Sequence, residues 1–201
     1  MTQQPTILCP WPEAEDEALG LALGIKAALA SLTLRDGTVL QDDQIREVMP
    51  DLDDPDEHAP AVAVGRVMGR LSGQGLAAMR LADEAGWVLF QDDDLIGEVD
   101  VVCWGQTPQE RSMLMAAVKG RLSSHGPISG RLAFDVPLPD YFPGTNSKAR
   151  LTYRGPRQED GEIEVMRRHR IGYQTFQFRM PVLRAEWVGV ASVIGIPSVA
   201  R

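Results

Sequence analysis

The chain has 201 residues, of which 44% are hydrophobic and 24% charged, and its formal net charge is −8 at pH 7. This composition is typical of a folded soluble protein and excludes an intrinsically disordered chain. No apolar run approaches the roughly 20 residues that a membrane-spanning helix needs, and the opening sequence lacks the basic and apolar regions of a signal peptide.

The N-terminal part of the chain predicts one helix followed by an acidic loop. The helix runs from about Glu13 to Ser31, with acidic residues in its first turns and a broad apolar face. Within it, Gly20 and Gly24 permit close packing against another backbone. Residues 35–48 are expected to form a short hairpin or turn and a further helical turn. The acidic, proline-rich residues 50–60 read as a loop, and they lack the spacing and the glycine of a calcium-binding loop.

The middle of the chain predicts short strands separated by turns. Strands are expected at Ala61–Val67 and Trp87–Gln91, with Gly69–Gly75 as a hairpin tip between them. The run Asp92–Asp94 is interpreted as a hairpin turn. Residues 76–82 fit neither a helix nor a strand clearly.

The stretch from Leu95 to Ser124 predicts a strand, a well-specified helix start and an amphipathic helix. Apolar residues alternate with their neighbours up to Trp104, which is the period of a strand with one buried face. The sequence from Thr107 to Glu110 is a capping box with proline at the first helical position. We expect Thr107 to accept a hydrogen bond from the amide of Glu110, and the Glu110 side chain to accept one from the amide of Thr107. A helix over residues 108–122 then presents one apolar face: Leu114, Ala117, Val118 and Leu122.

The rest of the chain is rich in strand patterns. The clearest is Tyr173–Met180, where apolar and polar residues alternate with a period of two. The loop at residues 137–148 is rich in proline and glycine and carries the aromatic residues Tyr141 and Phe142. Further strands are expected at Arg131–Val136, Ala149–Arg154, Glu162–Arg168 and Glu186–Ile194.

This order of elements predicts the fold class α+β. We expect a mostly antiparallel sheet covered by the N-terminal helix and the central helix, with extended hairpins and loops. Residues 1–201 are expected to form a single domain, in which a core at about 13–125 is followed by a strand-rich C-terminal elaboration at 131–201.

The two halves of the chain carry opposite charge. Residues 1–100 contain 20 acidic and 6 basic residues, a net charge of −14, whereas residues 101–201 contain 8 and 14, a net charge of +6. Separate acidic and basic faces would favour head-to-tail association, or DNA at one face and protein at the other. The alternative is that the two halves mix in space and the charges only solvate the surface.

No motif in the sequence indicates catalysis. The histidines His58, His125 and His169 show no metal-ligand spacing, and the two cysteines, Cys9 and Cys103, are far apart. The glycines at 65–75 match neither phosphate-binding loop, and no nucleophile elbow is present. We therefore expect no enzyme, no metal and no cofactor, and we expect two buried or unreactive thiols in a reducing compartment.

One basic cluster stands out as a candidate interface. Arg167, Arg168, His169 and Arg170 are expected at the tip of a hairpin, where guanidinium groups can bind phosphates or carboxylates. Arg150, Arg154 and Arg157 are candidates to join this cluster, and Tyr141 and Phe142 complete the predicted protein or DNA interface. The alternative is a solubilising surface that also discourages pairing between sheet edges.

The pattern over residues 13–125 resembles the small α/β proteins that complete phage tails, the tail-terminator or tail-completion family at the head–tail junction. The resemblance follows the N-terminal helix, a strand of the form P-x-V-x-V-G and a strand that leads through a polar turn into a helix. From Arg131 onward the chain is longer and richer in strands than a minimal member of that family. The matching residues are Pro60, Val62, Val64, Gly65, Val99, Val101, Trp104, Glu110, Arg111, Ala116, Ala117, Val118 and Leu122.

The resemblance implies a structural virion protein, assembled in the host cytoplasm, that terminates or completes the tail and joins it to the head connector. It implies a homo-oligomeric ring, a hexamer, in contact with tail tube, sheath and head-connector proteins, with DNA passing through the lumen without specific binding. It carries no catalytic residue. The alternatives are a baseplate or other neck component, a nucleic-acid-binding module that uses the basic C-terminal half, and a small enzyme whose site the sequence does not reveal.

Overall fold

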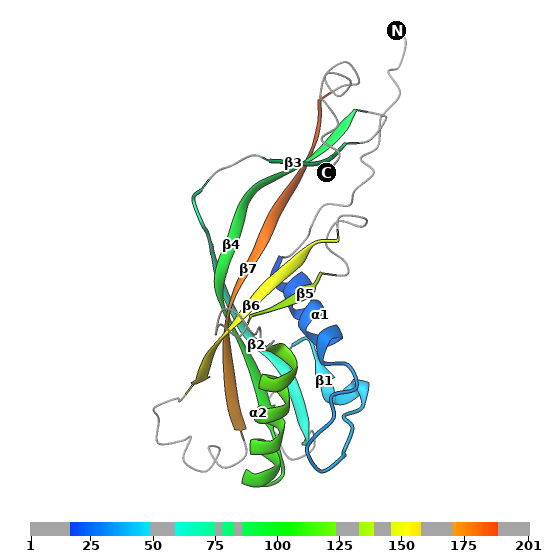
Figure 1. The fold of residues 1–201 in the computed structure, drawn as a ribbon, viewed down its shortest axis with the longest axis vertical. Helices are drawn as coiled ribbons and strands as arrows, with labels where there is room; N and C mark the ends of the chain where they lie inside the picture. Colours follow the sequence, from blue (N-terminus) through cyan, green and yellow to red (C-terminus); the bar gives the residue numbers. More distant parts are fainter. Residues whose placement is uncertain are drawn as a thin grey trace.

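The protein is a mixed α+β molecule with an elongated shape (Figure 1). The computed structural model describes residues 17–48, 59–74, 78–82, 86–123, 133–138, 146–157 and 171–188. The predicted α+β class is confirmed. Within the described ranges the chain forms two α-helices, one 3-10 turn (η1, Asp42–Gln44) and a seven-stranded sheet.

The two helices form where their capping and apolar patterns predict them. Helix α1 spans Glu17–Leu29 and ends just before Ser31, whose φ of 56° lies in the left-handed region. Its Gly24 packs closely on β5, since a Cβ there would lie 2.4 Å from the carbonyl oxygen of Pro137. Helix α2 spans Pro108–Leu122, the predicted range.

Two hydrogen bonds were predicted at the N-terminus of α2, of which one is confirmed and the other is wrong. The hydroxyl of Thr107 accepts a hydrogen bond from the Glu110 amide at 3.1 Å, as predicted. The Glu110 carboxylate, however, accepts from the amide of Gln106 at 2.6 Å rather than from Thr107. The Gln106 amide lies before the helix and needs an acceptor of its own, which the Glu110 carboxylate supplies.

The sheet is antiparallel except at one edge. Its strand order is β1-β2-β4-β7-β6-β5, and β3 also pairs with β4. Only the short pairing of β1 with β2 is parallel. The strands span Ile45–Arg46 (β1), Ala61–Leu71 (β2), Ala78–Ala82 (β3), Trp87–Trp104 (β4), Ala133–Pro137 (β5), Lys148–Arg157 (β6) and Ile171–Trp187 (β7).

The predicted turn at Asp92–Asp94 is wrong, because these residues lie inside the continuous strand β4. Strand β4 pairs with β7 from Trp87↔Trp187 to Trp104↔Ile171, with a β-bulge between Gln91 and Asp93. The predicted hairpin tip at Gly69–Gly75 is also partly wrong, since β2 continues to Leu71 opposite Leu95. In both places, pairing with a long neighbouring strand outweighs the local preference of Asp and Gly for turns.

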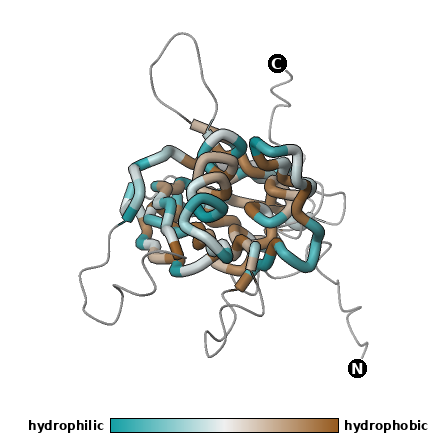
Figure 2. Tube along the Cα trace, turned by 90° about the horizontal axis from the view of Figure 1, so that it is seen from below, coloured by the Kyte–Doolittle hydropathy of each residue, from teal (hydrophilic) through white to brown (hydrophobic). Residues whose placement is uncertain are grey.

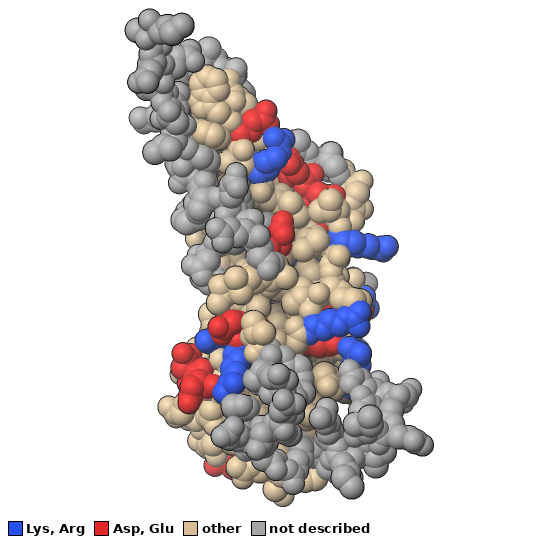
Figure 3. All heavy atoms as spheres, turned by 180° about the vertical axis from the view of Figure 1, so that it is seen from behind, with Lys and Arg blue, Asp and Glu red and all other residues tan. Residues whose placement is uncertain are grey.

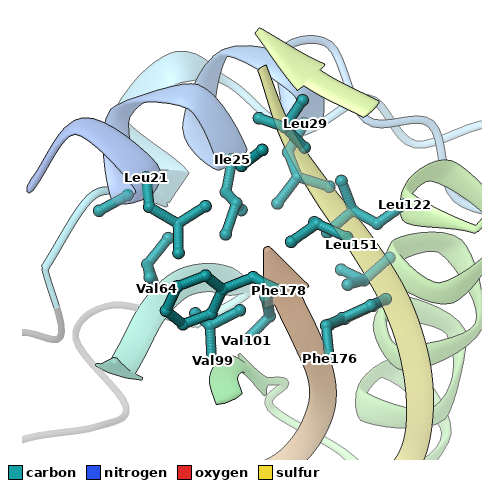
Figure 4. Close-up of a cluster of buried hydrophobic side chains, with 14 of the residues drawn as sticks. Leu21, Ile25, Leu29, Val64, Val99, Val101, Leu122, Leu151, Phe176 and Phe178 are labelled. Carbon is teal, nitrogen blue, oxygen red and sulfur yellow. The ribbon is translucent and has the colours of Figure 1, made fainter. Parts of the chain in front are cut away.

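The main hydrophobic core lies between the sheet and the two helices. Figure 4 shows α1 residues packing towards β4, β6 and β7, with Phe176 and Phe178 among the buried side chains. Seen along the long axis, hydrophobic segments gather towards the centre of the molecule (Figure 2). Burial of each large apolar side chain contributes about 1.5–3 kcal/mol. The core therefore joins both predicted parts of the chain, because α1, β4, β6 and β7 all contribute to it.

The end of β4 is buried on both faces, whereas the sequence predicted one buried face. Val99, Val101 and Cys103 face the helices, as predicted. On the opposite face, Val102 and Trp104 belong to a second, smaller cluster. Its other buried members are Ala61, Ala63 and Ile171.

We predict that Gly97→Ala destabilises the protein by ~1–3 kcal/mol or more. A Cβ at Gly97 would lie 1.9 Å from the carbonyl oxygen of Met68, so β2 would have to move away from β4. Gly120→Ala in α2 is the matched control, because a Cβ there meets nothing within 4 Å. The control should gain about 0.5–1 kcal/mol from helix propensity. Urea unfolding of both variants checks this, and wild-type stability of Gly97→Ala would contradict the β2–β4 register.

Candidate functional site

The candidate site is the face of the sheet that lies opposite the two helices, called here the outer face. Figure 3 shows this side, where acidic and basic side chains lie next to one another along the molecule. Its acidic residues come mainly from β4, and arginines of β6 and β7 pair with them. The outer face therefore brings together the acidic first half and the basic second half of the chain.

Two aspartates near the middle of β4 pair with arginines of β7. The Arg179 guanidinium donates to Asp94 through Nε at 2.6 Å, and Arg184 donates to Asp92 at 2.6 Å. Arg184 also pairs with Glu186 at 2.6 Å. Hydrogen bonds to these two carboxylates raise the pKa of Arg184 above its usual value. These pairs tie the two strands together on either side of the β-bulge.

Asp100 is the most buried carboxylate among the described residues, with 6% of its surface exposed. It accepts from Arg157 on β6 at 2.7 Å and from the Thr175 hydroxyl on β7 at 2.6 Å. A buried carboxylate is stable as an ion only when it is paired and hydrogen-bonded. Asp100 therefore fixes β4, β6 and β7 relative to one another.

Asp93 joins the end of β2 to β4. Its carboxylate accepts hydrogen bonds from the Ser72 hydroxyl, from the Gly73 amide at 2.9 Å and from the Asp94 amide at 2.7 Å. These bonds, that of Ser72 above all, hold the pKa of Asp93 below its ordinary value. Asp93 therefore acts as a structural acceptor that anchors the chain where it leaves β2.

The predicted interface is only partly within the described residues. Arg154 and Arg157 both lie on β6, where Arg154 donates to Gln177 and Arg157 pairs with Asp100. Both arginines therefore make contacts within the chain itself. The other predicted interface residues lie outside the described ranges: Arg167, Arg168, His169, Arg170, Tyr141 and Phe142.

The ion pairs between β4 and β7 were not predicted from the sequence. Arg179 and Arg184 lie 85 and 92 residues away from their aspartate partners, so no local spacing links them. The available signal was the position of Asp100 in a strand of buried valines, which predicts that this carboxylate needs a partner. The three pairs from β4 to β6 and β7 support the alternative in which acidic and basic halves mix in space.

A groove of about 560 Å³ opens beside β4, β6 and β7. Lys148, Arg150 and Arg179 line it, together with Asp94 and Pro181. A smaller hollow of about 240 Å³ lies beside Asp100 and Arg157. The larger groove therefore holds more positive than negative groups, unlike the smaller hollow, where Arg66 and Arg157 balance Glu98 and Asp100.

No group of three or more His, Cys, Asp or Glu side chains that could hold a metal occurs in the described part of the chain. Within the same part, neither helix is long and apolar enough to cross a membrane. No family model matches the chain, and no curated protein matches it.

We predict that Asp100 and Arg157 are more strongly coupled than Asp92 and Arg184. Only 9% of the Asp100 side chain is exposed, against 35% for Asp92. Double-mutant cycles with alanine should give about 1–3 kcal/mol for the first pair and about 0.2–1 kcal/mol for the second. Equal coupling energies from urea unfolding would show that the burial of Asp100 does not strengthen its interaction with Arg157.

We also predict that Cys103 is unreactive in the folded protein. Its thiol is fully buried in the core, and burial raises its pKa far above the ordinary value. A Cys9→Ser variant leaves Cys103 as the only thiol, since Cys9 is the other cysteine of the sequence. Ellman's reagent should label this variant only after unfolding. Rapid labelling under native conditions would place Cys103 at an accessible position.

Proposed function

We propose that the protein is a structural virion protein of a tailed phage. It assembles as a homo-oligomeric ring, a hexamer, that terminates or completes the tail and joins it to the head connector. Its partners are the tail tube, sheath and head-connector proteins, and DNA passes through the lumen without specific binding. Its function is assembly rather than catalysis.

The observation that carries this proposal is the pair of open sheet edges on the long β4–β7 ribbon. Beyond Ala63, β2 pairs only with β4 among the described residues. On the other side, the Val182–Glu186 segment of β7 also pairs only with β4 in the described ranges. Open strands carry backbone groups that another strand can pair with. Because the two edges lie on opposite sides of the ribbon, they suit head-to-tail association.

Head-to-tail contacts of this kind form a closed ring when the rotation between copies is right. The two edges are different surfaces, so each protomer offers one edge to each neighbour. Exposed apolar side chains also lie at the β2 edge, where Met68 is 48% and Leu71 60% exposed. These side chains are suited to burial between copies.

The charges of the described residues favour this proposal over a nucleic-acid-binding module. Arg157, Arg179 and Arg184 are neutralised by carboxylates of the same protomer. The net charge of −8 opposes general attraction to DNA. A negatively charged ring would let DNA pass through its lumen without retaining it.

We expect the purified protein to form a closed oligomer at high protein concentration and low salt. Size-exclusion chromatography with light scattering gives its mass, and negative-stain electron microscopy shows whether it is a ring. A protein that stays strictly monomeric under these conditions would contradict the proposal.

We further expect Leu71→Glu to weaken this assembly about tenfold or more, because it places a charge at the β2 edge. Leu19→Glu is the matched control, since Leu19 is 44% exposed and lies on α1, outside the sheet. Both variants should fold, which circular dichroism checks. Equal assembly of the two variants would exclude the β2 edge from the interface.

A further inference from the structure

The groove beside β4, β6 and β7 holds an excess of positive charge that the protomer itself does not neutralise. Lys148, Arg150 and Arg179 line it, and Asp94 is the carboxylate among its described lining residues. Asp94 is engaged by Arg179. Neither Lys148 nor Arg150 forms an ion pair or a side-chain hydrogen bond within the described ranges. The groove therefore offers two available cations.

The register of β6 with β7 places two of the three cations that line the groove directly opposite one another. Arg150 on β6 lies opposite Arg179 on β7, where like charges repel, and Asp94 offsets this repulsion only in part because it pairs with Arg179 and not with Arg150. Asp135 lies opposite Arg150 on β5, but these two side chains form no ion pair. An added anion above Arg150 would relieve the repulsion and would form charge-assisted hydrogen bonds.

The groove also lies next to an open sheet edge. Pro181 and Leu183 line it, and the adjoining Val182–Glu186 segment of β7 pairs only with β4 among the described residues. Pro181 has no amide hydrogen, which suits a position at the edge of a sheet. A strand that is added to β7 would therefore bring its neighbouring side chains over the groove.

We propose that the groove binds carboxylates of a second copy of this chain, and that this contact sets the register between neighbouring protomers. Charge complementarity identifies the occupant, because residues 1–100 carry 20 acidic against 6 basic side chains, and in the described ranges only Asp92, Asp94 and Asp100 of these pair with arginines of the second half. Carboxylates from residues 1–100 of one copy therefore bind in the groove of the next copy. This inference rests on the proposed ring, and it names the contact that orients one copy on another.

The test compares two charge-reversal variants by analytical ultracentrifugation. A double variant, Lys148→Glu with Arg150→Glu, should raise the dissociation constant of the assembly about tenfold or more. Arg35→Glu and Lys119→Glu together form a control with the same charge change, outside the groove and outside the sheet. Wild-type assembly should also weaken with increasing salt. Thermal unfolding measured by circular dichroism confirms that each variant is folded.

The outcomes separate this inference from the proposed function. A wild-type protein that is monomeric throughout would overturn both. A wild-type assembly that the groove variant leaves unchanged would overturn the groove contact alone. A third arm measures binding of a labelled DNA duplex by fluorescence anisotropy. DNA binding that is lost in the groove variant, with assembly unchanged, would replace carboxylates by phosphates as the occupant and would overturn the inference.

Discussion

The pairing of β4 with β7 is the interaction on which the rest of the molecule depends. It runs from Trp87↔Trp187 to Trp104↔Ile171 and joins distant parts of the chain. On one face it carries the apolar residues that pack under α1 and α2. On the other face it carries the aspartates that pair with Arg179 and Arg184. These contacts join residues that are far apart in the sequence. The entropy of closing the loop between the two strands is therefore lost before the contacts can stabilise the fold.

Residues with strong local signals were predictable from the sequence. Thr107 and Pro108 fixed the start of α2, and alternation in Tyr173–Met180 identified the buried face of β7. The run Asp92–Asp94 was not predictable, since its strand conformation depends on pairing with residues of β7 that lie more than 80 positions away. The groove could not be predicted from the sequence either, because the register of β6 with β7 is what brings Lys148, Arg150 and Arg179 together. Local sequence therefore predicted the elements, and long-range pairing determined the surface.

The outer face uses its charge in two different ways. At Asp100 and Arg157, opposite charges meet within one protomer and hold three strands together. At Lys148 and Arg150, charge is left unpaired among the described residues, beside a segment of β7 that pairs only with β4 in the same ranges. Because carboxylates of the same chain neutralise Arg157, Arg179 and Arg184, these three arginines add little general affinity for nucleic acid. In the proposed ring, the charge of Lys148 and Arg150 is the local attraction that orients one copy on another.

The central claim is that other copies cover the open edges of the β4–β7 ribbon. Hydrogen–deuterium exchange of the wild-type protein at low and high protein concentration tests this most directly. Amides that are open in one protomer should gain protection when a neighbouring strand pairs with them. The account predicts slower exchange at residues 64–71 and 182–186 as concentration rises, with little change in α2. Exchange at both edges that is independent of concentration would contradict it.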